Sequence, residues 1–252
     1  MSRQRIGAPW VGLLLAWAAA PLFSAVANSV PPPTGVVVEK TTPAFEAARV
    51  GIRPGDVLLS WDRGANPPAN PKAASGLFRS PFDVTEAFIE QAPRGTPKIT
   101  LTVLRGGDRT AISIGQYPWR VDTRPQFPEA WLSRYEEGRR LIEQGDAEKG
   151  LGVWRTLAGG ASAAGRHVDS AWLWRRVGMK LSEAKQVEPA IAALGGAIEE
   201  ARRAARPDIE SQLWLSHLEV FRAANRRQDA REAGRQAIST RERMAPDSVG
   251  VA

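Results

Sequence analysis

Cysteine is absent from this sequence of 252 residues, and only two histidines occur in it, His167 and His217. Without cysteine the chain has no disulfide bonds, no thiolate ligands for a metal, no cysteine nucleophile and no lipid-modified N-terminal cysteine. Neither histidine lies in a His-x-x-x-His pair, and no serine lies in a Gly-x-Ser-x-Gly motif. The sequence therefore predicts no catalytic residues, no bound metal and no cofactor.

Long apolar runs are scarce too, and the run near the N-terminus is short for a membrane span. It extends from Trp10 to Phe23 and is interrupted by Pro21, whereas a span needs about 20 apolar residues. Two arginines precede the run, and Ala25-Val26-Ala27 places small residues where a signal peptidase cleaves. We predict that residues 1–27 are a secretory signal cleaved near Ala27, with no integral membrane segment after cleavage. The chain would then be periplasmic or secreted; an uncleaved anchor is the alternative.

Acidic residues are fewer than basic residues in this chain, 27 against 34. The formal net charge is +7, and it falls by two, to +5, without Arg3 and Arg5. The other arginines are interleaved with glutamates in the second half of the chain, whereas nucleic-acid binding requires clustered positive charge. Apolar residues make up 43% and charged residues 24%, as in an ordinary globular protein. We therefore expect protein or peptide partners and no nucleic acid.

The first half of the chain alternates short strands and helices. Residues 28–33 form a proline-rich lead that is not helical. The residues that follow predict, in order, a strand, a helical turn, a tight turn, a strand, a loop, a helix and a hairpin. These segments are Gly35–Val38, Pro43–Ala48, Arg53–Asp56, Val57–Trp61, 64–81, Asp83–Glu90 and Lys98–Ile114. They predict a small α+β domain over residues 34–115, and we expect residues 116–128 to be a linker.

From residue 129 to residue 245 the sequence predicts helices only, and it repeats with a period of 40 residues. One repeating position holds Gly138, Gly178 and Leu218. Three further rows have the same period, namely Leu141, Leu181 and Phe221; Gly150, Ala190 and Ala230; and Leu157, Ala197 and Ala237. Small residues let the two helices of a hairpin approach closely, so the repeat predicts three stacked helical hairpins. We expect residues 246–252 to be a disordered tail.

The first half resembles a bacterial PDZ domain. The residues that carry the resemblance are Gly35-Val36-Val37-Val38, Pro43-Ala44-x-x-Ala47-Ala48, Gly51-Ile52-x-Pro54-Gly55-Asp56-Val57-Leu58 and the hairpin through Arg105-Gly106-Gly107. The resemblance implies a small β-sandwich or barrel that binds an extended peptide by strand addition at a sheet edge, beside a helix that supplies a pocket. The candidate peptide-binding residues are therefore Gly35, Val36, Val37 and Val38 on the strand, and Val84, Ala87 and Phe88 on the helix.

Two departures from the PDZ pattern concern this peptide site. The carboxylate-binding loop and its strand normally lie upstream of Gly35, where only residues 28–34 remain after signal cleavage. The long segment 64–81 also replaces the usual connection before the pocket helix. Whether a peptide carboxylate is bound is therefore open, and the three apolar residues of the helix alternatively serve the core alone.

The second half resembles tetratricopeptide-type helical hairpins of a longer period, over about Trp131 to Met244. Trp174 and Trp214 occupy one aromatic position of that pattern, whereas the first repeat has Arg134 there. The resemblance implies an all-α solenoid that binds proteins. The candidate surface residues are Trp174, Trp214 and Arg175, and packing between hairpins is the alternative role of the tryptophans.

Two further motifs have structural explanations. The segment Gly160–His167 superficially resembles a phosphate-binding loop, but it lacks the lysine and the magnesium-binding hydroxyl, so we expect a flexible loop between helices. Asp56 and Asp62 suggest paired carboxylates, yet Asp56 lies in the Arg53–Asp56 turn and is expected to stabilise it by hydrogen bonds. Both histidines are expected to be surface or packing residues.

These features predict an exported, non-catalytic adaptor or scaffold that binds peptides or proteins through a PDZ-like domain and TPR-like repeats. Two alternatives stay open. In the first alternative, the chain is a regulatory component that acts in trans in an envelope proteolytic system. In the second, it is a structural envelope protein that assembles with copies of itself.

Overall fold

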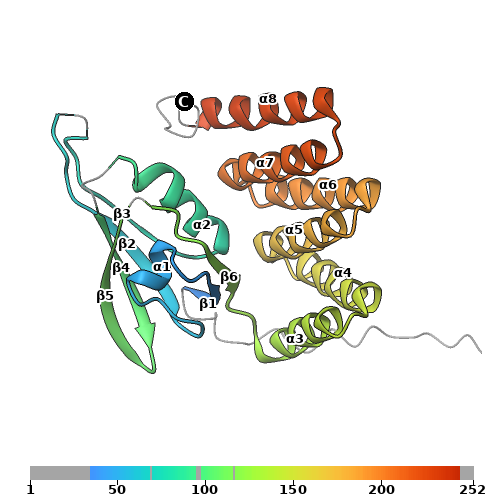
Figure 1. The fold of residues 1–252 in the computed structure, drawn as a ribbon, viewed down its shortest axis with the longest axis horizontal. Coiled ribbons are helices and arrows are strands. Elements are labelled where there is room, and N and C mark those ends of the chain that lie inside the picture. Colours follow the sequence, from blue (N-terminus) through green and yellow to red (C-terminus); the bar gives the residue numbers. More distant parts are fainter. Residues whose placement is uncertain (1–34, 69, 95–97, 116, 245–252) are drawn as a thin grey trace, which may run out of the picture. The chain divides into compact units, whose positions relative to one another are not determined.

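The computed structural model describes residues 35–68, 70–94, 98–115 and 117–244. These residues form an antiparallel sheet of six strands and a series of helices, which is an α+β fold in two parts (Figure 1). They all belong to one compact unit, Pro31–Ala252. The predicted signal 1–27, the lead 28–33 and the tail 246–252 lie outside the described residues.

The sheet has the strand order β5-β4-β2-β1-β6, and β3 pairs with β2. The strands are β1 (Val36–Thr41), β2 (Val57–Arg63), β3 (Ala74–Leu77), β4 (Lys98–Arg105), β5 (Asp108–Gly115) and β6 (Val121–Pro125). Alternate residues of β1 and β4 are buried, because successive side chains of a strand face opposite sides. Apolar residues of three short helices complete this core. These helices are α1 (Glu46–Arg49), α2 (Pro81–Glu86) and its π-helical continuation η1 (Ala87–Gln91).

Two strands lie where the sequence predicted none. β3 lies within the expected loop 64–81, and β6 lies within the expected linker 116–128, so part of each segment belongs to the sheet. β3 has no β-branched residue, but Gly76 lets it pair closely with β2, since a Cβ atom there would lie 2.6 Å from Nε1 of Trp61. β6 is short and ends at Pro125, which gave it the composition of a linker.

The turn before β2 is held by the carboxylate of Asp56, as the sequence predicted. Asp56 Oδ2 accepts a hydrogen bond of 2.8 Å from the Arg53 N–H, and both carboxylate oxygens accept bonds of 2.7 Å from the Arg105 guanidinium. Burial alone would raise the pKa of Asp56, but these bonds hold it below its usual value. Asp56 is therefore committed to the structure of the turn.

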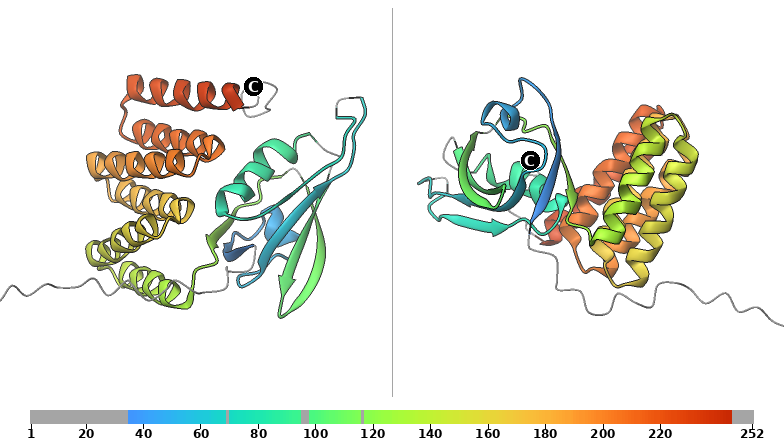
Figure 2. Two further views of the ribbon diagram at one scale, coloured as in Figure 1. Left: turned by 180° about the vertical axis from the view of Figure 1, so that it is seen from behind. Right: turned by 90° about the horizontal axis from the view of Figure 1, so that it is seen from below.

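The helical part repeats every 20 residues, which is half of the period seen in the sequence. Its helices are α3 (Glu129–Glu143), α4 (Ala147–Ala163), α5 (His167–Glu183), α6 (Val187–Arg203), α7 (Pro207–Ala223) and α8 (Arg227–Met244). They follow one another as a stack in chain order (Figure 1 and Figure 2). Each turn between them contains one residue with positive φ, namely Gly145, Gly165, Lys185, Ala205 and Asn225. Equal helices and equal turns place every second helix on the same side of the stack.

The close approach of paired helices depends on glycine, as predicted from the 40-residue rows. A Cβ atom on Gly138 would lie 2.5 Å from the ring of Trp154, and one on Gly178 would lie 2.8 Å from Leu194. In the third hairpin the two sizes are exchanged, because Leu218 on α7 packs against Gly234 on α8. The leucine at position 218 thus preserves the packed volume of the pair.

The segment Gly160–His167 is not the flexible loop that the sequence predicted. Helix α4 continues to Ala163, and α5 begins at His167, so only three residues connect the two helices. Packing overrides the low helix propensity of glycine here, since Ala158 and Ala161 are fully buried. Throughout the part of the chain that the structure describes, no helix is both long enough and apolar enough to cross a membrane.

Two neighbouring glycines of α4 test this packing. Gly150→Ala is expected to lower the free energy of unfolding by about 1–3 kcal/mol, because its Cβ atom would lie 2.5 Å from the Gly138 carbonyl oxygen. The matched control Gly152→Ala meets no atom within 4 Å and is expected to raise the free energy of unfolding by about 0.5–1 kcal/mol. Urea unfolding followed by circular dichroism measures both. Equal stability of the two variants would contradict the packing.

Candidate peptide-binding site

The predicted peptide-binding strand, β1, has no free edge. It pairs with β2 on one side and with β6 on the other. Val36 and Val38 are fully buried in the sheet core, and a Cβ atom on Gly35 would lie 2.6 Å from the Val57 side chain. Strand addition to Gly35–Val38 is therefore excluded, and the expectation that this strand presents the edge was wrong. β6, from the segment after the hairpin, occupies the edge beside β1.

The outer strand on this side of the sheet is β6, and its register shows which backbone groups face outward. The Val38 N–H donates to the Asp56 carbonyl at 2.8 Å, and the Val38 carbonyl accepts from the Gly55 N–H at 2.9 Å, so both groups point away from β6. Thr123 pairs with Val38. Because the backbone groups of Val38 point away from β6, Val38 and Thr123 form a non-hydrogen-bonded pair. In a pair of this kind the N–H and C=O groups of both residues point away from the partner strand. The N–H and C=O of Thr123 thus face the outer edge of β6, where the described residues contain no further strand. The edge is not open to solvent at this point, since Thr123 is only 8% exposed.

A cavity of about 480 Å³ lies beside β6. Asp122 of β6 lines it together with Glu39 and Lys40 of β1, and side chains of α3, α4 and α5 form the rest of the wall. Four of its lining residues are acidic, four are basic and the remaining three are apolar. Those last three are Ile142, Trp154 and Met179. The cavity therefore offers paired charges next to apolar surface, which suits a protein segment better than a single small ion.

The three predicted pocket residues of the helix serve mainly the sheet core. Val84 on α2 and Ala87 on η1 are buried, at 5% and 1% exposure. Phe88 is partly buried and its ring lies 5.6 Å from that of Trp119, which is itself buried. Phe82, which the sequence analysis did not single out, belongs to the apolar core of the helical part. The structure thus brings Val84, Ala87 and Phe88 together, on the core side of their helix.

The polar side of α2 and η1 is bound by the last two long helices. Arg241 of α8 donates two hydrogen bonds to Glu86, at 2.8 and 2.9 Å, and a third to Glu90 at 3.2 Å. The Gln212 amide of α7 donates to the Phe82 carbonyl at 3.2 Å. The Arg241 side chain is 3% exposed and that of Glu86 is 26% exposed, so this bidentate pair is partly buried. The helix that would form the wall of a peptide groove is therefore held in place by the repeats.

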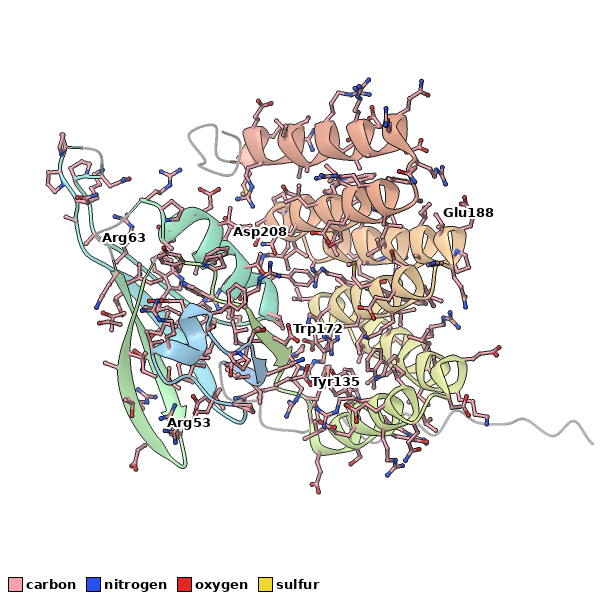
Figure 3. All side chains as sticks on the ribbon, viewed as in Figure 1. Arg53, Arg63, Tyr135, Trp172, Glu188 and Asp208 are labelled. Atoms are coloured by element: carbon pink, nitrogen blue, oxygen red, sulfur yellow. The ribbon has the colours of Figure 1, made fainter. Side chains whose placement is uncertain are left out.

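A second set of buried polar contacts centres on Glu39. Its carboxylate accepts hydrogen bonds from the Tyr135 hydroxyl, at 2.9 and 3.1 Å, and from Arg176 at 3.3 Å. Tyr135 stacks on Trp154 and lies 5.5 Å from the ring of Trp172 (Figure 3). Burial raises the pKa of the Tyr135 hydroxyl, so it stays protonated and donates to Glu39. This contact fixes β1 against α3 and α5.

The three predicted surface residues of the repeats are all partly buried. Trp174 and Trp214 are partly buried and pack against the apolar core of the helical part. Arg175 donates from Nε to the Ser216 hydroxyl at 2.9 Å, and burial lowers the pKa of its guanidinium. These three side chains belong to the packing of α5 and α7 rather than to an open surface.

Neither histidine is placed as a catalytic base toward a nucleophile. His167 Nδ1 and the Ser162 hydroxyl both contact the same carboxylate, that of Glu200, at 2.8 and 2.9 Å. His217 is buried between Trp214 and Phe221, its ring Nε2 lies 3.2 Å from the Ile191 carbonyl oxygen, and burial lowers its pKa. The prediction that His217 is a packing residue is confirmed. Among the residues that the structure describes, no group of three or more histidine and carboxylate side chains is placed to bind a metal.

The residues that define this site were largely missed by sequence reasoning. Thr123, Glu39, Tyr135 and Arg241 are isolated polar or aromatic residues without a motif around them. One signal did exist, because Val121 and Thr123 alternate with charged residues directly after a hairpin, as in a half-buried strand. Comparison of the sequence with protein-family models and with curated proteins finds no match.

Removal of the Arg241 guanidinium tests how firmly α2 is held. Arg241→Ala is expected to lower the free energy of unfolding by about 2–3 kcal/mol, because it removes the bidentate partner of the partly buried Glu86 carboxylate and one partner of the buried Glu90 carboxylate. Arg243→Ala, on the same helix, removes only bonds to Ser239 and Thr240 and is expected to cost less than about 0.5 kcal/mol. Chemical denaturation measures the free energy of unfolding of both variants. Equal losses of stability would contradict a stabilising role of the Arg241–Glu86 pair.

Proposed function

We propose that this chain is an exported, non-catalytic adaptor that binds an extended segment of a partner protein by strand addition to β6. The observation that carries the proposal is the outward-facing backbone of Thr123 on the outer strand of the sheet. An outer strand whose N–H and C=O groups face away from the sheet is a template for another strand. Because Thr123 is 8% exposed, the partner segment would have to displace the side chains that cover this edge. The signal sequence predicted for residues 1–27 supports the exported location.

The resemblance to PDZ domains supports the same mode of binding, with one change. The acceptor strand is β6, from the segment after the final hairpin, in place of Gly35–Val38. The next outward-facing residue of β6 is Pro125, which pairs with Val36 and needs no hydrogen-bond partner for its nitrogen. A bound segment would therefore form its central backbone bonds with Thr123.

The repeats are proposed to contribute side-chain recognition. The cavity beside Asp122 is lined by Arg139 of α3 and by Arg176 and Lys180 of α5. The side chains of a segment paired with β6 would meet these cations and the acidic residues between them. Backbone bonds would supply affinity, and the charges of the cavity would supply selectivity. The TPR-like repeats thus form part of one binding site rather than a second one.

Strand addition is tested by a substitution that removes one backbone donor. Peptides selected from a random peptide library on the full chain are measured by fluorescence polarisation. Thr123→Pro is expected to weaken their binding at least tenfold, because proline has no N–H, while the sheet tolerates it as it tolerates Pro125 at the same edge. Thr123→Val keeps the N–H and the side-chain shape, and we expect its affinity to stay within twofold of the unsubstituted chain.

Thermal unfolding serves as the control for both variants, and their melting temperatures should differ by only a few degrees. Selected peptides that bind Thr123→Pro as tightly as the unsubstituted chain would refute binding at β6. A chain that selects no peptide at all would also count against the proposed function.

The non-catalytic part of the proposal has its own test. His167 and Ser162 share Glu200 as a partner and do not contact each other as a base and a nucleophile would. Incubation of the purified protein with casein is therefore expected to yield no fragments over the background of a buffer control. Cleavage that disappears when a single serine is replaced by alanine would show that the chain is a protease.

A further inference from the structure

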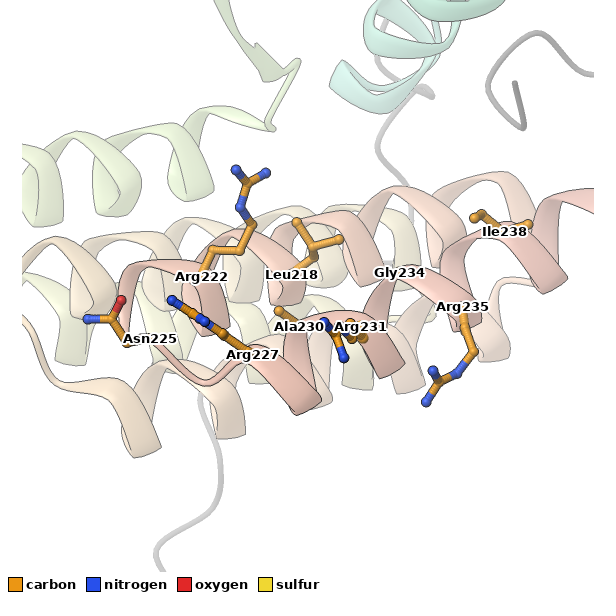
Figure 4. A pocket seen from close by; sticks show the side chains of 9 residues that line it. All are labelled: Leu218, Arg222, Asn225, Arg227, Ala230, Arg231, Gly234, Arg235 and Ile238. Atoms are coloured by element: carbon orange, nitrogen blue, oxygen red, sulfur yellow. The ribbon is translucent and has the colours of Figure 1, made fainter.

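The last helical hairpin carries an open groove that the proposed peptide site does not use. It lies between α7 and α8 and has a volume of about 610 Å³ (Figure 4). Leu218, Ala230, Gly234 and Ile238 form an apolar floor. Ile238 is 43% exposed, which is unusual for an isoleucine at a position that is buried in the earlier hairpins.

The same groove of the two earlier hairpins holds a helix. The Ser170 hydroxyl of α5 donates to the Ala158 carbonyl of α4 at 2.9 Å, and the His217 ring of α7 contacts the Ile191 carbonyl of α6. Ile238 stands two repeats after Ala158, and it stands one repeat after Ile198, which is 2% exposed. The groove of the third hairpin is thus built to the plan of a helix-binding surface, and α8 is the last helix among the described residues.

The walls of this groove differ from those of the first hairpin in charge. There, the groove that receives α5 is lined by Ile142, Ala147 and Leu151. The residues two repeats later are Arg222, Arg227 and Arg231, and each is exposed. Arg155 corresponds to a fourth arginine, Arg235, so all four wall positions of the last groove carry a positive charge.

Three of these arginines lack an acidic partner among the described residues. Arg222, Arg227 and Arg231 form no ion pair within the described part of the chain, whereas Arg235 pairs with Glu232. The adjacent Arg226, in contrast, binds both Glu188 and Asp229. None of the residues that line the groove is acidic. A surface that needed only to be soluble would be served by both signs of charge.

We propose that this groove binds an acidic amphipathic helix of a partner protein, which stacks on α7 and α8 as α7 stacks on α5 and α6. Its apolar face would cover Leu218 and Ile238, and its carboxylates would pair with Arg222, Arg227 and Arg231. The repeated plan of the hairpins selects a helix as the ligand, and the unpaired arginines select an acidic one. This surface is separate from β6 and does not depend on strand addition there.

A synthetic helix tests the proposal. The probe is a fluorescein-labelled peptide with the sequence of residues 207–223, carrying Arg222→Glu, because α7 already fits the equivalent groove of the second hairpin. Its binding to the full chain is measured by fluorescence polarisation at low salt. We expect the double variant Arg227→Glu with Arg231→Glu to bind the probe at least tenfold more weakly, since both charge pairs become repulsive. Binding is also expected to weaken as the salt concentration rises.

Two matched variants separate this groove from general attraction between charges. Arg109→Glu with Arg140→Glu changes the net charge by the same amount on β5 and α3, and its affinity for the probe should stay within twofold. Ile238→Ser removes apolar floor without changing charge and is expected to weaken binding about fivefold, in line with the loss of a partly buried side chain. Thr123→Pro should leave binding of the probe unchanged.

Several outcomes would overturn the proposal. These are no detectable binding of the probe, an equal loss in the Arg109 and Arg140 variant, and equal affinity for a probe whose three native acidic residues are replaced by lysine. Light scattering that shows self-association of the chain, lost in the Arg227 and Arg231 variant, would assign the groove to a second copy instead. Binding to vesicles of phosphatidylserine with the same arginine dependence, without binding of the probe, would assign it to a membrane surface.

Discussion

The contact between Glu39 and Tyr135 is the interaction on which the arrangement of this molecule depends. Glu39 lies where the register of β1 shifts against β6, between Val38 and Lys40, and such a bulge turns a side chain out of the regular alternation. The carboxylate is thereby directed to Tyr135 and Arg176 and is buried with them. Taking a carboxylate out of water is costly unless donors surround it. The bulge in β1 directs the Glu39 carboxylate, and the side chains of α3 and α5 supply the donors that make its burial tolerable.

The second link between sheet and helices has the same polarity as the first, in which Arg176 of the repeats pairs with Glu39 of the sheet. Here the buried cation, Arg241, comes from the repeats, and the carboxylates of Glu86 and Glu90 come from the sheet part. In both links the sheet part thus supplies carboxylates and the repeats supply an arginine. Apolar contact is continuous as well, because Phe82 packs in the core of the helical part. A ligand at β6 would bind beside helices that these contacts already hold in place.

The elements with strong local signals were predictable from the sequence, and those determined by distant partners were not. A few neighbouring residues are enough to predict the β-branched strand β1 and the Gly-Asp turn before β2. The glycine rows likewise predict the close helix pairs of the repeats. β6 has no such signal, because a short strand ending in proline acquires its meaning only when β1 lies beside it. The same holds for the site, since the roles of Thr123, Glu39 and Arg241 arise from residues more than 80 positions away. The family resemblance placed strand addition on β1, which is paired on both sides in the sheet.

The pairing of β1 with β6 has a consequence for how the chain is completed during synthesis. The first strand of the sheet to leave the ribosome must wait for one of the last, and until Val121–Pro125 emerges its hydrogen-bonding edge has no partner. A fragment that ended after the hairpin at Gly115 would keep that edge open, with Val37 and its neighbours ready to pair with another chain. The folding boundary of the sheet therefore lies beyond Pro125, within reach of the first helix of the repeats.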